Sequence, residues 1–407
     1  MSGIDELIAE RCPSGVPHVE VARIFDLRNG YTPPKSNVSF WSGGNVAWFR
    51  MEDIRANGGV LGAAQQQVPE AAVKGGRLFP ASSLLVATSA TIGEHALVTV
   101  PHLSNQRFTS LTPRAEYASR LDMKFAYYYG FKLDDWCRTN TTTSSFSSVD
   151  MAGFKKFKFP LPPLEVQREI VRILDTFTEL EAELEAELEA RRRQYEHYRS
   201  ALLAPNSMSS LRWATLGEIS LHVSSGGTPL AGRPEYYQQG SIPWLRTQEV
   251  RFVDVWDTEM RITERALKDS SAKWIPANCV IVAISGATAG RSAVNRVPLT
   301  TNQHCCNFEI DPSQADYRYV FYWVRSQYEH IKALGQGARS DLNSAIIRSV
   351  KIPIPPFTVQ REIVATLDAF DTLVNDLSVG LPAELAARRK QYEYYRDKLL
   401  AFEELTA

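Results

Sequence analysis

The sequence predicts an α+β protein in which two globular domains, related by pseudo-twofold symmetry, are held apart by two long antiparallel helices. Three observations support this fold class. The stretch PLPPLEVQREIVRILD at 160–175 returns as PIPPFTVQREIVATLD at 353–368, further matches extend over nearly the whole chain, and each copy ends in a long run of helical periodicity. A long unit that occurs only twice indicates tandem domains and not a solenoid.

The repeat divides the chain into four segments. We expect a first globular domain at 1–160, a central spacer helix at 161–205, a second globular domain at 206–352 and a C-terminal spacer helix at 353–407. Within the globular segments, the matched stretches are VAWFRMEDI with IPWLRTQEV, TSATIG with SGATAG, and SNQRF with TNQHC. Each copy is therefore a globular domain followed by a helix.

The central helical segment is expected to form one helix. Apolar residues such as Ile170, Leu174 and Phe177 recur at helical spacing, and no Gly or Pro lies between Leu164 and Leu203. This predicts a helix of about 40 residues and about 60 Å. The second copy is longer by one tetrapeptide and contains Gly380 and Pro382 there, which predicts a kink or a short break.

The leucine ladder of these helices leaves two interpretations open. The first ladder contains ELEAELEAELEA at 179–190. A leucine at every fourth position drifts around the helix, so the apolar stripe needs partners on more than one side. The two helices of the chain pack on each other, or further helices from another chain also cover the stripe.

Each globular segment combines strand and helix signals. SLLVATSA and NCVIVAIS are short β-rich runs among turns rich in Gly, Pro, Ser and Asn, whereas LDMKFAYYYGFKL and YRYVFYWVRSQYEHIKAL are helical runs. This mixture predicts an α+β fold in both copies.

Composition places the chain among water-soluble proteins. It has 407 residues, of which 44% are hydrophobic and 22% charged. No apolar run approaches the roughly 18 residues of a membrane span, and the N-terminus lacks the features of a signal peptide, so we expect a cytoplasmic protein without membrane contact. The five scattered cysteines and seven unclustered histidines predict neither a disulfide framework nor a metal site.

Charge is distributed unevenly along the chain. The net charge is -1, yet both globular segments carry a small excess of Lys and Arg, and both helical segments carry an excess of Asp and Glu. This distribution is compatible with DNA binding by the globular domains.

The motifs of an enzyme are missing from the sequence. It has no Walker-type phosphate loop, no GxGxxG after a strand, no GxSxG and no HExxH. IPPF at 354–357 is similar to the Asn-Pro-Pro-aromatic loop of amino-methyltransferases, but Ile354 replaces the amide side chain that the chemistry requires. We therefore predict no catalytic residue and no cofactor in this chain.

The remaining candidates suit the recognition of double-stranded DNA. Arg donates two hydrogen bonds to guanine and Gln pairs with adenine, while other cations neutralise phosphates. Differing residues at matched positions are the better candidates for reading different sequences, whereas shared residues favour a role in the fold. The candidate DNA-binding residues are Thr32, Lys35, Arg50, Arg77, Ser89, Thr91, Gln106, Arg107, Thr228, Arg246, Gln248, Arg251, Ser285, Thr288, Arg291, Gln303 and Arg339.

Several motifs occur in both halves of the chain: the G-x-TP start, PW-R, the ATIG-like turns, the NQ pair, PPLEVQREI and QYEYYR-KLL. In these motifs the chain resembles the specificity (S) subunit of type I restriction-modification systems. The resemblance covers nearly all residues. It implies that each globular half is a target recognition domain for one part of a split, asymmetric DNA sequence, and that the helices are the spacer. Two methyltransferase (M) subunits, and restriction (R) subunits where the system has them, are the implied partners.

The resemblance also implies where S-adenosylmethionine and the flipped adenine belong, namely in the M subunits. The M subunits would dock against the spacer helices. The candidate interface residues are Gln167, Ile170, Leu174, Tyr195, Gln360, Ile363, Leu367 and Tyr392.

Two other classes of function stay open beside a DNA-recognition subunit. One is a divergent DNA methyltransferase or nuclease with its own catalytic site, which predicts S-adenosylmethionine binding by the isolated chain. The other is a coiled-coil adaptor without DNA contact, which leaves the two β-rich domains unexplained.

Overall fold

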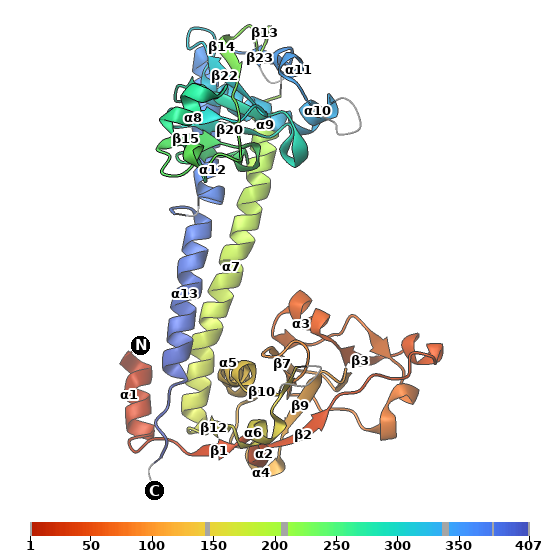
Figure 1. The fold of residues 1–407 in the computed structure, drawn as a ribbon. Coiled ribbons are helices and arrows are strands. Elements are labelled where there is room, and N and C mark those ends of the chain that lie inside the picture. The colour runs from red at the N-terminus through yellow and green to blue at the C-terminus, as the bar shows by residue number, and fades with distance from the viewer. Residues whose placement is uncertain (1, 143–146, 205–210, 336–341, 377, 406–407) are drawn as a thin grey trace. The chain divides into compact units, whose positions relative to one another are not determined.

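The computed structural model describes residues 2–142, 147–204, 211–335, 342–376 and 378–405. These residues form two compact units (Figure 1). Unit 1 comprises 1–183 and 385–407, and unit 2 comprises 184–384. Each unit therefore combines one globular domain with parts of both helical segments. The segments expected from the sequence instead assign each helical segment to one copy of the repeat.

Unit 1 is an α+β unit. Its helices are α1 (Ser2–Arg11), α2 (Val21–Ile24), α3 (Met51–Asn57), α4 (Ala115–Ala118), α5 (Met123–Thr139), α6 (Met151–Lys156), the first part of α7 (Leu164–Leu202) and most of α13 (Leu381–Leu399), with short 3₁₀ turns η1 (Val38–Trp41), η2 (Glu70–Ala72) and η3 (Lys74–Gly76). Its strands are β1 (His18–Glu20), β2 (Phe25–Asn29), β3 (Val46–Phe49), β4 (Val60–Leu61), β5 (Gln67–Val68), β6 (Ser83–Ala87), β7 (His95–Val98), β8 (His102–Ser104), β9 (Phe108–Pro113), β10 (Thr141–Thr142), β11 (Ser148–Val149) and β12 (Lys158–Pro160).

Unit 2 has the same mixture. Its helices are the second part of α7, α8 (Glu264–Asp269), α9 (Tyr317–Ser326), α10 (Tyr328–Ala333), α11 (Ser344–Arg348) and α12 (Phe357–Asn375), with 3₁₀ turns η5 (Pro234–Tyr236), η6 (Thr247–Glu249) and η7 (Gly286–Thr288). Its strands are β13 (Arg212–Thr215), β14 (Ser220–Ser225), β15 (Ile242–Leu245), β16 (Asp254–Val255), β17 (Arg261–Ile262), β18 (Trp274–Ile275), β19 (Val280–Ala283), β20 (Ser292–Asn295), β21 (Leu299–Thr301), β22 (Cys305–Ile310) and β23 (Lys351–Ile354).

The five-stranded sheets of the two units share one topology, and the second sheets share a parallel pair of strands. Unit 1 has a five-stranded sheet in the order β2-β9-β6-β7-β4, and unit 2 has its counterpart in the order β14-β22-β19-β20-β16. In both sheets only the last pair, β7-β4 or β20-β16, is parallel. A second sheet contains the parallel pair β3-β8 in unit 1 and β15-β21 in unit 2.

The junction between each domain and its helix is also repeated. The strand before the helix pairs antiparallel with the first strand of the domain, β12 with β1 and β23 with β13. Asp122 and Asp316 directly precede helices α5 and α9, and their carboxylates accept hydrogen bonds from the backbone of the first turn. Such N-caps satisfy amides that the helix itself leaves unpaired.

The helical segments match the sequence prediction. Helix α7 is a single helix of 39 residues, whereas the second copy is divided into α12 and α13, which confirms the expected interruption near Gly380. A Cβ atom at position 380 would lie 2.4 Å from the carbonyl oxygen of Thr372, so the chain returns here at a distance that only glycine permits.

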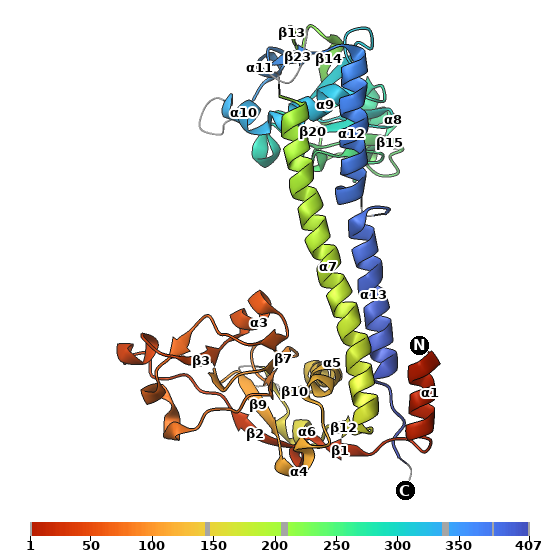
Figure 2. The ribbon, with the colours of Figure 1, turned by 180° about the vertical axis from the view of Figure 1, so that it is seen from behind.

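Each unit contains an antiparallel helix pair made from both copies of the repeat (Figure 2). In unit 1, Phe177 of α7 contacts Tyr392 and Tyr395 of α13, with ring centroids 6.4 and 5.5 Å apart. In unit 2, Phe370 of α12 contacts Tyr195 and Tyr198 of α7, at 6.2 and 5.4 Å. The packing of the two helical segments on each other is therefore part of each unit.

The main core of each unit joins the five-stranded sheet to the helices. In unit 1 it runs from Leu84 and Val86 on β6 through Phe125 on α5 to Ile170 and Leu174 on α7. In unit 2 the corresponding core includes Val280 and Val282 on β19, Tyr319 on α9 and Leu367 on α12. Among the described residues, none of the helices has the length and apolarity needed to cross a bilayer.

Candidate nucleic-acid interface

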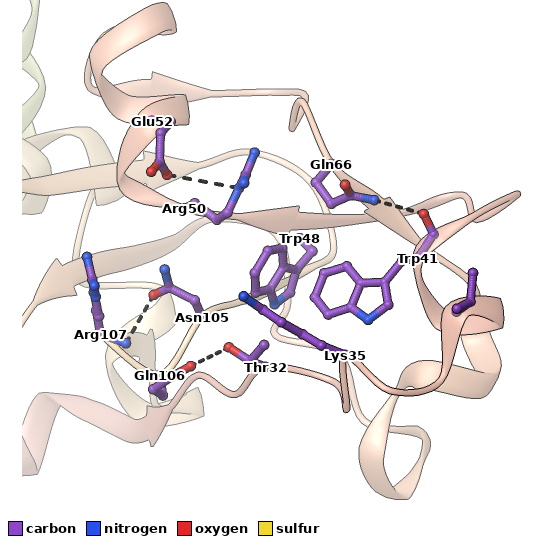
Figure 3. Close-up of a pocket in the computed structure, with 11 residues that line it drawn as sticks. Thr32, Lys35, Trp41, Trp48, Arg50, Glu52, Gln66, Asn105, Gln106 and Arg107 are labelled. Atoms are coloured by element: carbon purple, nitrogen blue, oxygen red, sulfur yellow. Dashed lines mark hydrogen bonds and ion pairs between the residues drawn. The ribbon is translucent and has the colours of Figure 1, made fainter.

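A concave site of about 580 Å³ lies on unit 1, beside the end of β3 (Figure 3). It brings together five of the predicted DNA-binding residues with six neighbours. Its lining consists of Thr32, Lys35, Val38, Trp41, Trp48, Arg50, Glu52, Gln66, Asn105, Gln106 and Arg107.

Two tryptophans form the apolar wall of this site. Trp48, on β3, is buried and its indole N–H donates to the carbonyl of Tyr31 at 3.0 Å. Trp41 meets it edge to face, with ring centroids 4.9 Å apart, and donates its own N–H to Pro34. Because both indoles are held by hydrogen bonds and packing, the wall is rigid.

Arg50 lies where β3 turns into α3. Its backbone N–H donates to the Asp53 carboxylate at 2.7 Å, which caps the helix, and its guanidinium group stands 5.7 Å from the Trp48 ring. Glu52 is the nearest carboxylate, 4.0 Å from Arg50 Nε. Within the described residues Arg50 Nε is buried and makes no hydrogen bond, which is rare for a buried donor.

The opposite rim consists of two short polar contacts. The Thr32 hydroxyl donates to the side-chain carbonyl of Gln106. Next to it, the Asn105 side chain accepts the backbone N–H of Arg107 at 3.0 Å and so holds the tip of the β8–β9 turn. Figure 3 shows Lys35 extending between this rim and the tryptophans.

The electrostatics of the site favour an anion with polar edges. Lys35, Arg50 and Arg107 place three cations around it, and Glu52 contributes one carboxylate. Lys35, Arg107 and Glu52 are exposed. Cations that remain hydrated and mobile are suited to phosphates, whereas fixed donors and acceptors are suited to base edges.

Unit 2 contains the same arrangement around the end of β15. Trp244 donates its indole N–H to Gly227 at 3.0 Å and meets Tyr237 edge to face. The backbone N–H of Arg246 donates to the Glu249 carboxylate at 3.2 Å. As in unit 1, a threonine hydroxyl, that of Thr228, donates to a glutamine, Gln303.

The charged groups of unit 2 are paired differently. Arg246 donates to Glu259 at 2.8 Å, and Gln248 donates to the same carboxylate at 3.3 Å. Arg251 donates to the backbone carbonyl of Gln248. The two domains thus share a frame and differ in the side chains around it.

The other predicted DNA-binding residues lie outside the concave site of unit 1 or on other turns of unit 2. Arg77 is exposed after η3, while Ser89 and Thr91 are half-buried in the β6–β7 turn. Ser285, Thr288 and Arg291 lie at the matching turn around η7. Arg339 lies outside the described residues.

Sequence reasoning missed the apolar wall and Asn105 as parts of the site. The repeated tryptophan of VAWFR and IPWLR was a usable signal, because an aromatic residue kept at one position of both copies marks a fixed wall. The contribution of Trp41 had no such signal, since its counterpart is Tyr237.

The predicted subunit-interface residues are mostly buried inside their own unit. Ile170, Leu174, Ile363 and Leu367 belong to the cores, and Tyr195 is 2% exposed. Burial raises the pKa of Tyr195 to about 12, and its hydroxyl donates to Asp371. Tyr392 is half-buried.

Gln167 and Gln360 are fully buried and link each helix to its domain. Gln167 accepts from the backbone N–H of Asp122 at 2.8 Å and donates to Arg120 and Pro162. Gln360 accepts from Asp316 at 2.8 Å and donates to Pro355. These buried residues make contacts of the junction inside each unit, and their assignment to an interface with another subunit stays a prediction.

A second repeated contact strengthens this junction. In unit 1, Asp175 of α7 accepts from Tyr128 and from Lys124, each at 2.6 Å. In unit 2, Asp368 of α12 accepts from Tyr322 and Arg318. Burial and the neighbouring carboxylate raise the pKa of both tyrosines, which stay neutral donors.

Across the described part of the chain, no three His, Cys, Asp or Glu side chains lie together as metal ligands would. The sites above consist of donors, acceptors and aromatic surface. They are suited to binding.

Comparison with known proteins agrees with a DNA-recognition protein built from two repeated domains. Residues 13–190 and 212–387 each match the family of the type I restriction modification DNA specificity domain. The chain belongs to this family, and its two globular parts are target recognition domains.

The type I restriction enzyme EcoprrI specificity subunit of Escherichia coli is 38% identical over 381 residues, which cover 89% of each chain. Two solved structures share the fold: the type I S subunit from M. genitalium (16% identity, TM-score 0.55, 96% of both chains) and the HsdS subunit from Thermoanaerobacter tengcongensis (15% identity, TM-score 0.55, 96% of this chain and 97% of that one).

Proposed function

We propose that this chain is the non-catalytic DNA-recognition subunit of a type I restriction-modification complex and that it binds a bipartite, asymmetric DNA site. Each target recognition domain binds one part of that site. The chain also holds two M subunits, which bind S-adenosylmethionine and methylate the target adenine, and R subunits join where the system has them.

The observation that carries the proposal is one polar site built twice on the same topology with different side chains. Two domains that recognise two different half-sites are expected to share a fold and to differ in the side chains around the site. Cations such as Lys35, Arg107 and Arg251 are exposed and can replace the counterions of the phosphates. Tryptophan walls and fixed donors then limit which base edges fit.

The binding surface for the M subunits is the exposed side of the helix pairs. A pair of helices covers only part of an apolar stripe, and Leu180 of α7 is 41% exposed while Tyr394 of α13 is 65% exposed. Exposed apolar residues at helical spacing are suited to further helices from a partner, as in a four-helix bundle.

The proposal is tested by co-expressing the chain with the M subunit of its host in a strain without other adenine methylation. Sequencing that detects methylated adenines is expected to find one two-part sequence with a fixed gap. Methylation at a single continuous sequence, or no methylation that depends on this chain, would contradict the proposal.

The enzyme alternative is tested on the isolated chain. Calorimetric titration with S-adenosylmethionine is expected to show no binding, because the cofactor belongs to the M subunit. Saturable binding with one molecule per chain would favour a methyltransferase.

A further inference from the structure

The two DNA-facing sites divide into a shared frame and two differing positions. The frame contains the tryptophan wall, the arginine at the helical turn and a threonine–glutamine contact. Its members are Trp48, Arg50, Thr32 and Gln106 in unit 1 and Trp244, Arg246, Thr228 and Gln303 in unit 2.

The threonine–glutamine contact is too similar in the two domains to distinguish two half-sites. In each, the threonine hydroxyl donates to the glutamine carbonyl, which uses one of the two lone pairs of this oxygen and fixes the orientation of the amide. Pairing with adenine uses the carbonyl and the amide N–H₂ of a glutamine together. With the amide oriented in this way, the N–H donors of each glutamine suit a phosphate oxygen of any sequence. In unit 2 the Gln303 amide nitrogen also lies 3.2 Å from His304 Nε2, so it has one further N–H for the backbone.

The first differing position lies two residues after the shared arginine. It is Glu52 in unit 1 and Gln248 in unit 2. Glu52 is 63% exposed, and Arg50 Nε lies 4.0 Å from its carboxylate. A carboxylate at this surface is repelled by phosphates, so the group on DNA that it can bind is an exocyclic amino group, cytosine N4 or adenine N6.

The second differing position follows the shared glutamine. Arg107 and His304 are both exposed, and in both domains the backbone N–H of this residue donates to an asparagine, Asn105 at 3.0 Å or Asn302 at 3.1 Å. The same turn therefore presents two different side chains. Arginine donates to guanine O6 and N7 as a fork, whereas neutral histidine offers one donor and one acceptor.

We propose that Glu52 and Arg107 determine the half-site of the first domain, that Gln248 and His304 determine that of the second, and that the threonine–glutamine contacts fix the register on the DNA backbone. The assignment rests on the proposed function. For the first domain it specifies a base with an exposed amino group opposite Glu52. It also assigns Gln106 and Gln303, which were expected to recognise bases, to contacts with the DNA backbone.

The chain supplies its own matched variants for a test. Glu52→Gln and Gln248→Glu exchange the first differing position between the domains, and Arg107→His and His304→Arg exchange the second. Each variant is co-expressed with the M subunit, and methylated adenines are mapped. Each exchange is expected to alter one position of one half only, with about tenfold or greater loss of methylation at the original sequence, and the two members of each pair must affect opposite halves.

Gln106→Ala and Gln303→Ala are the controls. Both are expected to lower methylation at all sites of the original sequence without changing that sequence. The exchanged side chains are exposed, so thermal unfolding midpoints close to that of the original chain are expected for the exchange variants. Gln248→Glu also replaces the 3.3 Å hydrogen bond to Glu259 with two like charges, which cost little at an exposed surface.

The inference is overturned if the exchanges leave the methylated sequence unchanged, if both members of a pair alter the same half, or if Gln106→Ala changes the sequence. These outcomes differ from failure of the proposed function, in which the unaltered chain itself directs no two-part methylation.

Discussion

Replacing Gln167 with leucine tests the junction between helix α7 and the first domain. The leucine keeps the size of the side chain but removes an amide that accepts from Asp122 and donates to Arg120 and Pro162, with distances of 2.8, 2.9 and 2.7 Å. Gln167 is fully buried, so water cannot replace the lost partners without a rearrangement.

The expected loss of stability follows from these contacts. Each hydrogen bond contributes about 1 kcal/mol, and each buried backbone group left unpaired costs about 1 to 3 kcal/mol. Because leucine regains some apolar burial, we expect the free energy of unfolding of unit 1 to fall by about 3 kcal/mol. Gln360→Leu is the matched variant, with a smaller loss because its amide makes two such bonds.

The assay is urea unfolding of the full chain. Unfolding is monitored by fluorescence, and the unfolding of each unit is identified from the rate of protease cleavage at sites within that unit. Gln167→Leu is expected to shift the transition of unit 1, and Gln360→Leu that of unit 2. If both variants unfold like the original chain but bind the M subunit more weakly, the glutamines act at the subunit surface and the junction role is refuted.

Three further predictions concern pH, spacing and the helix break. Burial lowers the pKa of His102 from 6.5 to about 4. Above pH 6.5 the side chain is neutral in both the folded and the unfolded chain, so the free energy of unfolding does not depend on its protonation. As the pH falls from 6.5 toward 4, the unfolded chain binds the proton first, and the free energy of unfolding decreases. His102→Leu, which copies Leu299 of unit 2, is expected to remove about 2 kcal/mol of this pH dependence in unfolding measured at pH 7 and pH 4.5; an unchanged dependence would contradict it. Deleting one ELEA from α7 removes about 6 Å of helix, and mapped methylation is expected to show a gap about two base pairs shorter; an unchanged gap would refute this. Gly380→Ala places a Cβ 2.4 Å from the Thr372 carbonyl and is expected to lower the unfolding midpoint, whereas an unchanged midpoint would show that the break adjusts freely.

The sequence repeat predicted the fold because each local signal was consistent with the next. Matched stretches became matched strands, and the Gly-free run from Leu164 became α7. Gly380 and Pro382 marked the break between α12 and α13. Such features depend on local propensity and on order along the chain, which a single sequence contains.

The sequence did not show that Gln167 and Gln360 are buried at the junction between helix and domain. Gln167 and Gln360 are polar and lie on amphipathic helices, so they suggest an exposed surface. They are buried because backbone groups from a distant segment, at Asp122 and Asp316, reach them. Contacts between segments far apart in sequence depend on the assembled unit.

The same limit applies to the candidate DNA site. The matched arginines were visible as WFR and WLR, but their surroundings differ because Glu259, from a separate loop, binds Arg246. The hydrogen bonds to the carbonyls of Gln106 and Gln303 likewise depend on Thr32 and Thr228, which are far away in the sequence.

The most direct test of the account is to exchange one domain and map the methylated sequence. Residues 212–352 are replaced by the corresponding domain of the EcoprrI specificity subunit, and the chimera is co-expressed with the M subunit. We predict that one half of the two-part sequence changes and the other half stays the same. A change in both halves, or in neither, would contradict the claim that each domain recognises its own part of the DNA.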